Sequence, residues 1–361
     1  MGALFMEQTG TQLLLKRFSE TNAMRSVLAR KWRMARRVLR SEGFWVLVWE
    51  IFCQGLKPLL KVYESLAWRW SCASGYLCFK VHGSVLTVLA GDHGISRELA
   101  AYRTHEPLAS KLLQQFLKPG MNVVDIGGNL GYYALLEART VGNAGRVIAI
   151  EPFAANFAQL SKNVYANGYG NILLHNVAVG AMNGAATMYI GKKSNWHALY
   201  PVPWKTREIT VAVSTLDALL AQHNLRSVDL IRMDLEGYEV EVIHGMGKTI
   251  ENYSPRLLVE LHPHVAGANA ILGLLRHLRA LGYDIDWLLD SERDHPIRSW
   301  FLRPEDVRLE ELFKDRRIIT GTRALHVLFA RRLAKRIPLE RSSSRALVQT
   351  ALGVRRSVSG G

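Results

Sequence analysis

Cysteine is scarce in this chain, with three residues in 361, at Cys53, Cys72 and Cys78. Their number is odd, no two of them form a Cys-x-x-Cys pair, and no distant Cys/His pairs accompany them. These absences argue against a disulfide framework and against a zinc site. We expect three small buried side chains in a reducing compartment. The pattern of a cleavable signal peptide is missing as well, because Glu7 interrupts the short apolar start, so we expect a cytoplasmic protein.

The chain also lacks an apolar run long enough to cross a bilayer. The segment FWVLVWEIFCQGL at 44–56 is strongly apolar, but Glu50 and Gln54 interrupt it, and a spanning helix needs about 18 apolar residues. Four of the nine tryptophans fall between residues 45 and 70, with Arg and Lys among them. Aromatic and basic side chains together are typical of a helix that lies at lipid headgroups. Two interpretations stay open: an interfacial helix, or a helical layer packed against the rest of the protein.

Acidic residues are outnumbered, and the net charge is +15, but the excess positive charge lies at the two ends. Residues 1–43 carry +6 and residues 330–361 carry +7, which leaves +2 for residues 44–329. A groove that follows nucleic-acid phosphates is basic, so a nearly neutral centre makes nucleic acid an unfavoured partner. Basic ends are instead attracted to anionic headgroups. We expect residues 1–75 and 333–361 to contact an anionic membrane peripherally, at its inner face.

The composition divides the chain into three parts. Residues 1–75 are predicted to be a basic, Trp-rich helical extension, with a helix from about Thr21 to Arg40. Residues 76–332 hold the main domain, which begins with two strands around a turn at His82-Gly83. Residues 333–361 are predicted to be a basic, disordered tail.

Within the main domain, continuous apolar segments alternate with amphipathic ones. This alternation is typical of an α/β fold with a doubly wound, mostly parallel sheet. The predicted strands of that sheet are 122–127, 146–152, 172–179, 229–235, 256–262, 283–289 and 326–332, and the predicted helices include 130–140, 154–167, 239–246 and 269–281.

A glycine-rich turn, VVDIGGNLG at 123–131, lies where the first of these strands gives way to a helix. It does not match the dinucleotide fingerprint G-x-G-x-x-G, and it lacks the lysine of a phosphate-binding loop. Asp125 at the strand end suits a ligand with a cationic amine, and Glu151 at the end of the next strand suits ribose hydroxyls. S-adenosylmethionine has both groups. Asn176, after the third strand, is a weaker candidate for the adenine edge. The predicted cofactor residues are therefore Asp125, Gly127, Gly128, Asn129, Gly131, Glu151 and Asn176.

The chain resembles the FkbM family of S-adenosylmethionine-dependent methyltransferases over roughly residues 90–290. The segments that carry the resemblance occur in the family's order: VVDIGGNLGYYALL, GRVIAIEP, NILLHNVAVG, DLIRMDLEGYEVEVIHG and LLVELHP. The resemblance implies a seven-stranded Rossmann-like class I methyltransferase fold and O-methylation of sugar or polyketide hydroxyls. SNWHAL at 194–199 departs from the family's usual loop, so the acceptor pocket is expected to differ.

Acidic side chains and an imidazole lie at the ends of two neighbouring predicted strands. Asp234 and Glu236 lie at the carboxyl end of the fourth predicted strand, and Glu260 and His262 at that of the fifth, where ligands bind in open α/β sheets. We expect them to remove the proton of an acceptor hydroxyl or to orient it, although Asp234 and Glu236 could instead satisfy turn and helix N–H groups. His197, in a loop over the strand ends, is a further candidate base. Such a group would suit Mg²⁺ or Mn²⁺, but the spacing does not establish a metal, and none is predicted.

Two acids in the helix that follows, Glu239 and Glu241, are predicted to face water. Glu106, ahead of the glycine turn, is a residue that could touch the cofactor.

The residues favour an enzyme that methylates a hydroxyl of a glycan, a glycolipid, a lipid-linked glycan or another small molecule. A nucleic-acid methyltransferase is the first alternative, but Asp-Leu-Glu-Gly at 234–237 is not the Asn/Asp-Pro-Pro-aromatic tetrad that holds an exocyclic amine. The second alternative is a membrane-surface binding protein with a degenerate methyltransferase fold, which the intact Asp125 and Glu151 disfavour.

Overall fold

The computed structural model of the protein describes residues 39, 44–75 and 77–331. The helix predicted from Thr21 to Arg40, except for Leu39, and the tail predicted at 333–361 lie outside the described residues. Among the residues described, no helix is both long and apolar enough to cross a membrane.

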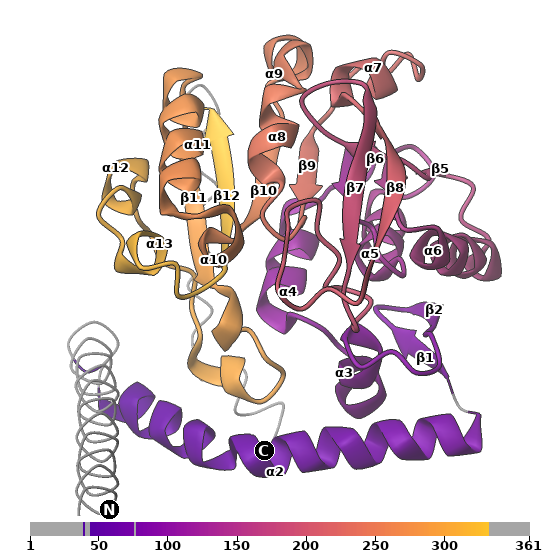
Figure 1. Cartoon of the computed structure of the whole chain (residues 1–361), viewed down its shortest axis with the longest axis vertical. Helices are drawn as coiled ribbons and strands as arrows, with labels where there is room; N and C mark the ends of the chain where they lie inside the picture. The colour runs from indigo at the N-terminus through magenta and orange to yellow at the C-terminus, as the bar shows by residue number, and fades with distance from the viewer. Residues whose placement is uncertain (1–38, 40–43, 76, 332–361) are drawn as a thin grey trace, which may run out of the picture.

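A seven-stranded sheet forms the centre of the described part of the molecule (Figure 1). Its order is β11-β12-β10-β9-β3-β4-β5. β12 runs antiparallel to both of its neighbours, whereas β10, β9, β3, β4 and β5 are parallel to one another. This arrangement confirms the predicted Rossmann-like class I methyltransferase fold. The strands are β3 (Asn122–Ile126), β4 (Arg146–Ile150), β5 (Ile172–His175), β9 (Leu230–Met233), β10 (Arg256–Leu261), β11 (Tyr283–Asp290) and β12 (Leu325–Arg331).

Helices cover both faces of the sheet because its strands are apolar on both faces. Successive side chains of a strand point to opposite faces. Val123 of β3 accordingly packs in one cluster with α4, α5 and α6, while its neighbour Val124 packs in the other with α7, α8, α9 and α11. The helices are α4 (Pro107–Phe116), α5 (Tyr132–Val141), α6 (Ala154–Asn167), α7 (Leu216–Leu220), α8 (Glu239–His244), α9 (Gly247–Tyr253), α10 (Pro263–Ala266), α11 (Ala268–Ala280), α12 (Leu309–Leu312) and α13 (Arg316–Ile319), with short 3₁₀ turns η1 (Ser291–Arg293) and η2 (Arg298–Phe301).

A smaller sheet interrupts the pattern after β5. The strand predicted at 172–179 is wrong as a single element, because β5 ends at His175 and β6 (Ala178–Val179) joins β8 (Arg207–Ser214) and β7 (Gly184–Ile190) in a sheet of its own. Asn176 lies at the break, where its side-chain amide donates to the backbone oxygen of Glu151 at 2.8 Å. The chain is tied to the end of β4 at this residue and cannot continue straight.

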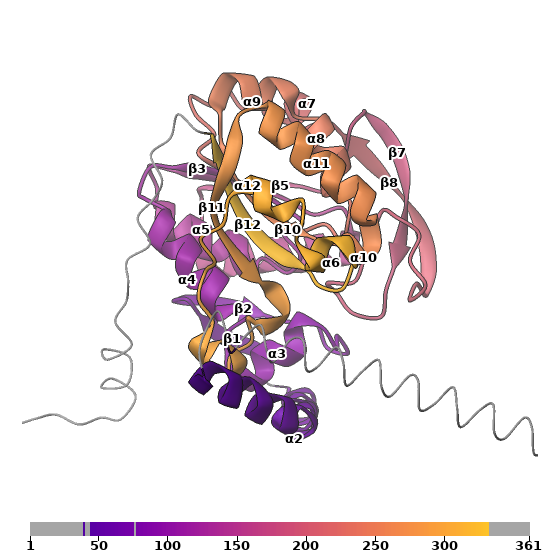
Figure 2. The same cartoon turned by 90° about the vertical axis from the view of Figure 1, so that its left-hand side faces the viewer.

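The N-terminal part consists of a long helix and a hairpin. The predicted turn at His82-Gly83 is confirmed, and it joins β1 (Cys78–Val81) to β2 (Ser84–Thr87). In both views α2 (Phe44–Ser74) lies along one side of the molecule, beyond α3 (Ile95–Tyr102) and the β1–β2 hairpin (Figures 1 and 2).

The cysteine prediction holds for one of the three residues. Cys53 is buried where α2 meets the domain, whereas Cys72 and Cys78 are exposed. The prediction is wrong for these two because Cys72 lies on the outward side of α2 and Cys78 on the outer face of β1.

Candidate active site

A cavity of about 480 Å³ opens at the carboxyl edge of the central sheet. The turn after β3 and the end of β4 line one end, and the ends of β9 and β10 line the other. The loop at 194–199 and residues of η1 and η2 complete its walls. Ligands of open α/β sheets bind at this edge, so the cavity lies where the sequence predicts a site.

The glycine turn approaches the neighbouring strand so closely that a side chain would not fit. Gly127 has a φ of +88°, and a Cβ there would lie 2.4 Å from the backbone oxygen of Asp234. Gly131 has a φ of +95°, and its Cβ would lie 2.8 Å from the side chain of Leu160. Gly127 must therefore be glycine for the β3 turn to pack against the residue after β9, and Gly131 for the turn to pack against α6. Gly128, by contrast, is in ordinary contact with its neighbours, the nearest at 3.4 Å. Gly131, a predicted cofactor residue, lies outside the cavity lining.

Glu151 is a buried carboxylate on the cavity wall, at the end of β4. Its Oε2 accepts a hydrogen bond from the backbone N–H of Asn129 at 2.9 Å, and its Oε1 accepts one from Phe153 N–H at 2.9 Å. Burial raises the pKa of Glu151 to about 7, against the effect of these two hydrogen bonds. The predicted cofactor residues Gly127, Gly128, Asn129 and Glu151 all line the cavity, and their contact with a cofactor stays a prediction.

Asp125 lies beneath the turn and outside the cavity lining. It is completely buried, and its Oδ1 accepts a hydrogen bond from Arg232 Nη1 at 3.0 Å. Arg232 also lies 3.4 Å from Asp234 Oδ2 and 3.7 Å from the ring centre of Tyr133. Arg232 was not predicted, although a charged residue inside the apolar strand LIRM was a signal for it.

Asn176 also lies outside the cavity lining. It is exposed, and its amide donates to the backbone oxygens of Glu151 at 2.8 Å and Pro152 at 3.1 Å. The structure therefore gives Asn176 a role in holding the chain at the end of β4, and its predicted contact with adenine stays untested.

The four predicted catalytic residues after β9 and β10 converge. His262 Nε2 lies 3.8 Å from Asp234 Oδ1, 3.9 Å from Glu236 Oε2 and 3.8 Å from Glu260 Oε2. The strands end at Met233 and Leu261, so a shared strand face does not explain this convergence. Instead, a tight turn at Glu236 and Gly237, with φ values of +50° and +103°, brings the Glu236 side chain near His262.

Glu239 belongs to the same group, and the prediction that it faces water is wrong. Its side chain is completely buried, and its Oε1 accepts hydrogen bonds from His262 Nδ1 at 2.9 Å and from the backbone N–H groups of Leu235 at 3.1 Å and Gly237 at 3.3 Å. The turn before α8 leaves these N–H groups without helical partners, and Glu239 satisfies them. Because Glu239 holds Nδ1, Nε2 of His262 is left facing the other carboxylates.

The group can hold protons near neutral pH. Burial, reinforced by Asp234, raises the pKa of Glu236 to about 8 and that of Glu260 to about 7. Burial alone would lower the pKa of His262, but Glu260 and Glu239 beside it raise that pKa well above its ordinary value. Asp234 is the most solvent-exposed of these acids, with 28% of its side chain accessible, so it is the one best placed to meet a ligand in the cavity.

His197 also lines the cavity, but it contacts other residues than this group does. Its ring packs against Phe153 at 4.6 Å, and its Nδ1 accepts a hydrogen bond from Gly191 N–H at 3.2 Å. Burial lowers the pKa of His197 to about 4, so the ring is neutral and carries its hydrogen on Nε2. In this state Nε2 of His197 is able to donate a hydrogen bond to a ligand, and the ring is a poor acceptor of a proton at neutral pH.

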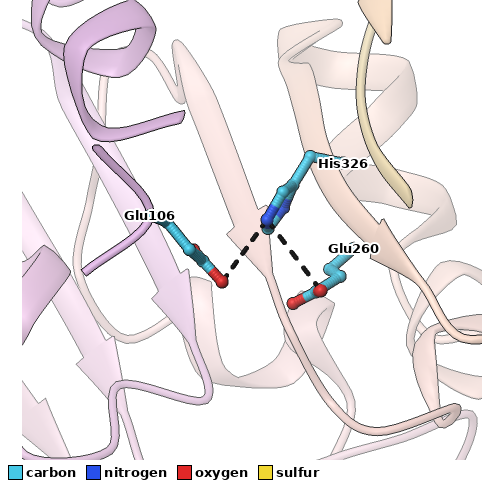
Figure 3. A group of neighbouring side chains, drawn as sticks. All are labelled: Glu106, Glu260 and His326. Carbon is cyan, nitrogen blue, oxygen red and sulfur yellow. Dashed lines mark ion pairs between the residues drawn. The ribbon is translucent and has the colours of Figure 1, made fainter. Parts of the chain in front are cut away.

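Two further titratable residues lie close to Glu260, and neither was predicted to lie there (Figure 3). His326 is the direct partner of Glu260 across the β10–β12 pair, and its Nε2 lies 3.9 Å from Glu260 Oε1. Glu106, just before α4, lies 3.4 Å from the same nitrogen. β12 is antiparallel and therefore begins at the edge where the other strands end. A histidine at the start of the last apolar strand was the available signal.

The sequence pattern of the FkbM methyltransferase domain matches residues 125–285, which contain the glycine turn and the acids after β9 and β10. A protein of Beauveria bassiana (strain ARSEF 2860) named Methyltransferase 1 is 26% identical over 159 residues, which cover 38% of this chain and 64% of that protein. Protein-L-isoaspartate O-methyltransferase 1 of Arabidopsis thaliana is 40% identical over 57 residues, 16% of this chain and 25% of that protein.

The crystal structure of a methyltransferase FkbM from Methylobacillus flagellatus KT aligns with a TM-score of 0.34 and 19% identity, over 46% of this chain and 38% of that one. The chain thus spans less than two thirds of the length of each of these relatives. Residues 125–285 of the chain are similar to the methyltransferase domain of the FkbM family.

Proposed function

We propose that the protein is an S-adenosylmethionine-dependent O-methyltransferase acting on a hydroxyl of a glycan, a glycolipid or another small molecule. One observation carries the proposal: a single cavity joins the glycine turn and Glu151 at one end to Asp234, Glu236, Glu260 and His262 at the other. The first end suits a nucleoside, and the second suits a hydroxyl that must lose its proton.

The first end fits this cofactor in its hydrogen-bonding groups. The side-chain oxygens of Asn129, Asn156 and Asn195 are buried in the cavity wall and have no hydrogen-bond partner among the described residues. Such acceptors suit the amine and the adenine amino group of S-adenosylmethionine, while Glu151 would accept from its ribose hydroxyls. When bound, the cofactor supplies an electrophilic methyl group.

At the second end Asp234 would act as the general base. It would take the proton of the acceptor hydroxyl as that oxygen forms its bond to the methyl carbon and the carbon–sulfur bond breaks. His262, held by Glu239, would keep the carboxylates in place. Alignment of the two reacting groups in one cavity supplies a large part of such an acceleration.

Mass spectrometry of cellular glycans and lipids tests the acceptor class. Cells that express the wild-type chain should contain species heavier by one methyl group than cells that express Asp234→Asn. Methylated RNA in place of these species, with a yield that falls at high salt, would overturn the proposed acceptor in favour of nucleic acid.

The affinity for S-adenosylhomocysteine should depend on pH through Glu151. The pKa of Glu151 is raised to about 7, so its carboxylate is ionised above that pH and protonated below it. Only the ionised form accepts fully from ribose hydroxyls, so affinity should be constant above pH 8 and about tenfold lower at pH 6. Calorimetric titrations from pH 6 to 8.5 measure this. Glu151→Gln should bind weakly at every pH, and a flat wild-type profile would contradict the assignment.

We also infer that α2 lies on an anionic membrane surface, which would bring a lipid-linked acceptor to the cavity. The polar side of α2 faces the protein: Glu50 pairs with Arg293 at 2.8 Å, and Glu64 lies 3.6 Å from Arg97 and 3.4 Å from His295. Its apolar side faces outward along the whole helix. The exposed residues on that side are Phe44, Trp45, Val48, Ile51, Phe52, Leu59, Val62, Tyr63, Leu66 and Trp70.

The position and charge of this face favour a membrane as its occupant. α2 packs on α3 and η2, and Glu98, His295 and Arg298 of that region line the cavity. Residues 1–43, which precede α2, carry a net charge of +6. An apolar helix face flanked by positive charge matches an interfacial helix on anionic lipid.

Flotation with vesicles containing phosphatidylserine tests this inference. The full chain should float, and Leu59→Glu with Leu66→Glu should reduce the bound fraction at least about tenfold, because two charges would enter the apolar layer. These side chains are 65% and 60% exposed, so the fold should tolerate the changes. Met182→Glu, at a residue 77% exposed on another surface, is the matched control. A wild-type chain that stays unbound, or that dimerises through α2 in light scattering, would overturn the inference.

A further inference from the structure

Glu106, Glu260 and His326 come from three separate parts of the chain and meet at one buried point (Figure 3). Glu106 precedes α4, Glu260 lies near the end of β10 and His326 near the start of β12. Nε2 of His326 lies 3.4 Å from Glu106 Oε1 and 3.9 Å from Glu260 Oε1. All three side chains are buried, and one atom from each lies within 4.8 Å of the others.

Nε2 of the buried His326 imidazole makes ion pairs with Glu106 at 3.4 Å and Glu260 at 3.9 Å, and no hydrogen bond within the described residues. The register of the β10–β12 pair fixes its position, because Glu260 and His326 are direct partners. A buried polar atom without a hydrogen bond is costly, so an atom held in this way points to a missing ligand.

Neighbouring hydroxyls position the two carboxylates. Tyr133 Oη donates to Glu106 Oε2 at 2.6 Å, which leaves Oε1 turned toward His326. Ser291 Oγ donates to Glu260 Oε1 at 2.5 Å. Donors of this kind orient the ligands of metal sites.

The two carboxylates need positive charge beside them. Without a metal the imidazolium of His326 supplies it: burial alone would lower the pKa of His326, but the two carboxylates raise this pKa to about 9. A bound metal ion would take the place of the imidazolium proton. His105 lies 3.4 Å from Glu106, but its Nδ1 is already paired with Glu98 at 2.8 Å. Asp294, buried on the same cavity wall, adds a further acid. Two neighbouring buried carboxylates are stable only when positive charge compensates them.

We propose that Glu106, Glu260 and His326 bind one divalent transition-metal ion, and that this ion is Mn²⁺. Two carboxylates favour Mn²⁺ and the alkaline-earth ions, and the imidazole shifts the preference toward the transition series. Neighbouring ligand atoms about 2.1 Å from an octahedral ion lie about 3.0 Å apart, so Glu106 and His326, now 3.4 Å apart, would approach slightly and Glu260 would move closer by more.

The consequence for catalysis rests on the proposed function. Oε2 of Glu260 faces His262, and through it Asp234, while Oε1 faces His326. The ion would therefore lie beside the acceptor end of the cavity. There it would polarise the acceptor hydroxyl and make its proton easier for Asp234 to remove.

Equilibrium dialysis of the full chain against Mn²⁺, followed by electron paramagnetic resonance, tests the site. The wild type, freed of metal by a chelator, should bind one Mn²⁺ per chain, and Glu106→Gln and His326→Asn should each bind at least about 100-fold more weakly. Glu292→Gln and His264→Asn make the same changes at other residues of the cavity wall and should bind as the wild type does. Mn²⁺ is preferred to Zn²⁺ as the probe because His175 and His223, with nitrogens 2.9 Å apart, could chelate zinc elsewhere.

Each result decides one question. A wild type that binds no Mn²⁺, or ligand variants that bind it as tightly as the controls, would overturn the site. Circular dichroism and the affinity for S-adenosylhomocysteine show that the variants are folded. Methyl transfer that persists in chelator, together with absent Mn²⁺ binding, would remove the metal and leave the proposed function intact. Mn²⁺ binding without methyl transfer would do the reverse.

Discussion

Asp234→Asn is expected to lower the rate of methyl transfer about 10²- to 10⁴-fold while leaving the affinity for S-adenosylhomocysteine unchanged. Asparagine keeps the shape of the side chain but cannot take a proton. Asp234 is the most accessible acid at the acceptor end of the cavity, and its Oδ1 lies 3.8 Å from His262 Nε2. The loss should appear in kcat, with little change in KM, because a base acts in the transition state. Formation of S-adenosylhomocysteine with the acceptor found by mass spectrometry measures it.

Two comparisons make this result specific to Asp234. Asp306→Asn, at an exposed aspartate outside the cavity lining, should leave the rate unchanged. A loss of less than about tenfold for Asp234→Asn would contradict its role as base. Glu236→Gln and Glu260→Gln would then distinguish the remaining acids, because both lie in the same group around His262.

The sequence predicted those parts of the site that follow from strand order alone. The carboxyl ends of parallel strands meet at one edge, so residues just after the first, second, fourth and fifth strands had to lie near one another. Gly127, Glu151 and Asp234 follow this rule, and Glu260 lies one residue before the end of β10. The central sheet could be predicted in the same way, because apolar strands alternating with helices have few stable arrangements.

The partner of each buried charge could not be predicted from the sequence. The apolar pattern of the short helix α8 does not show which of its sides faces the core. Glu239 is buried because its carboxylate accepts hydrogen bonds from N–H groups of the preceding turn. His326 meets Glu260 only because β12 inserts antiparallel between β10 and β11. That pairing depends on long-range register, which local patterns leave open. Asp125 was assigned to the cofactor because an acid at a strand end suits a cationic amine, and the sequence could not show that Arg232, 107 residues away, pairs with it.

Arg232→Met is expected to lower the free energy of unfolding by about 3–5 kcal/mol. The arginine is buried between Asp125, Asp234 and the ring of Tyr133. Methionine fills much of the space but leaves Asp125, which is completely buried, without its positive partner. An unpaired buried charge costs far more than the net value of the pair. Urea denaturation followed by circular dichroism measures the change.

Arg317→Met is the matched control for this argument. Arg317 is also buried and pairs with Glu305 and Asp315, but Glu305 is 31% exposed, so water can solvate it once the arginine is gone. Arg317→Met should therefore lower the free energy of unfolding by less, about 1–2 kcal/mol. Adding Asp125→Asn to Arg232→Met removes the stranded charge and should recover at least about half of the lost stability. If the double variant is no more stable than Arg232→Met alone, the cost lies in packing around Tyr133, and the unpaired charge of Asp125 is not its cause.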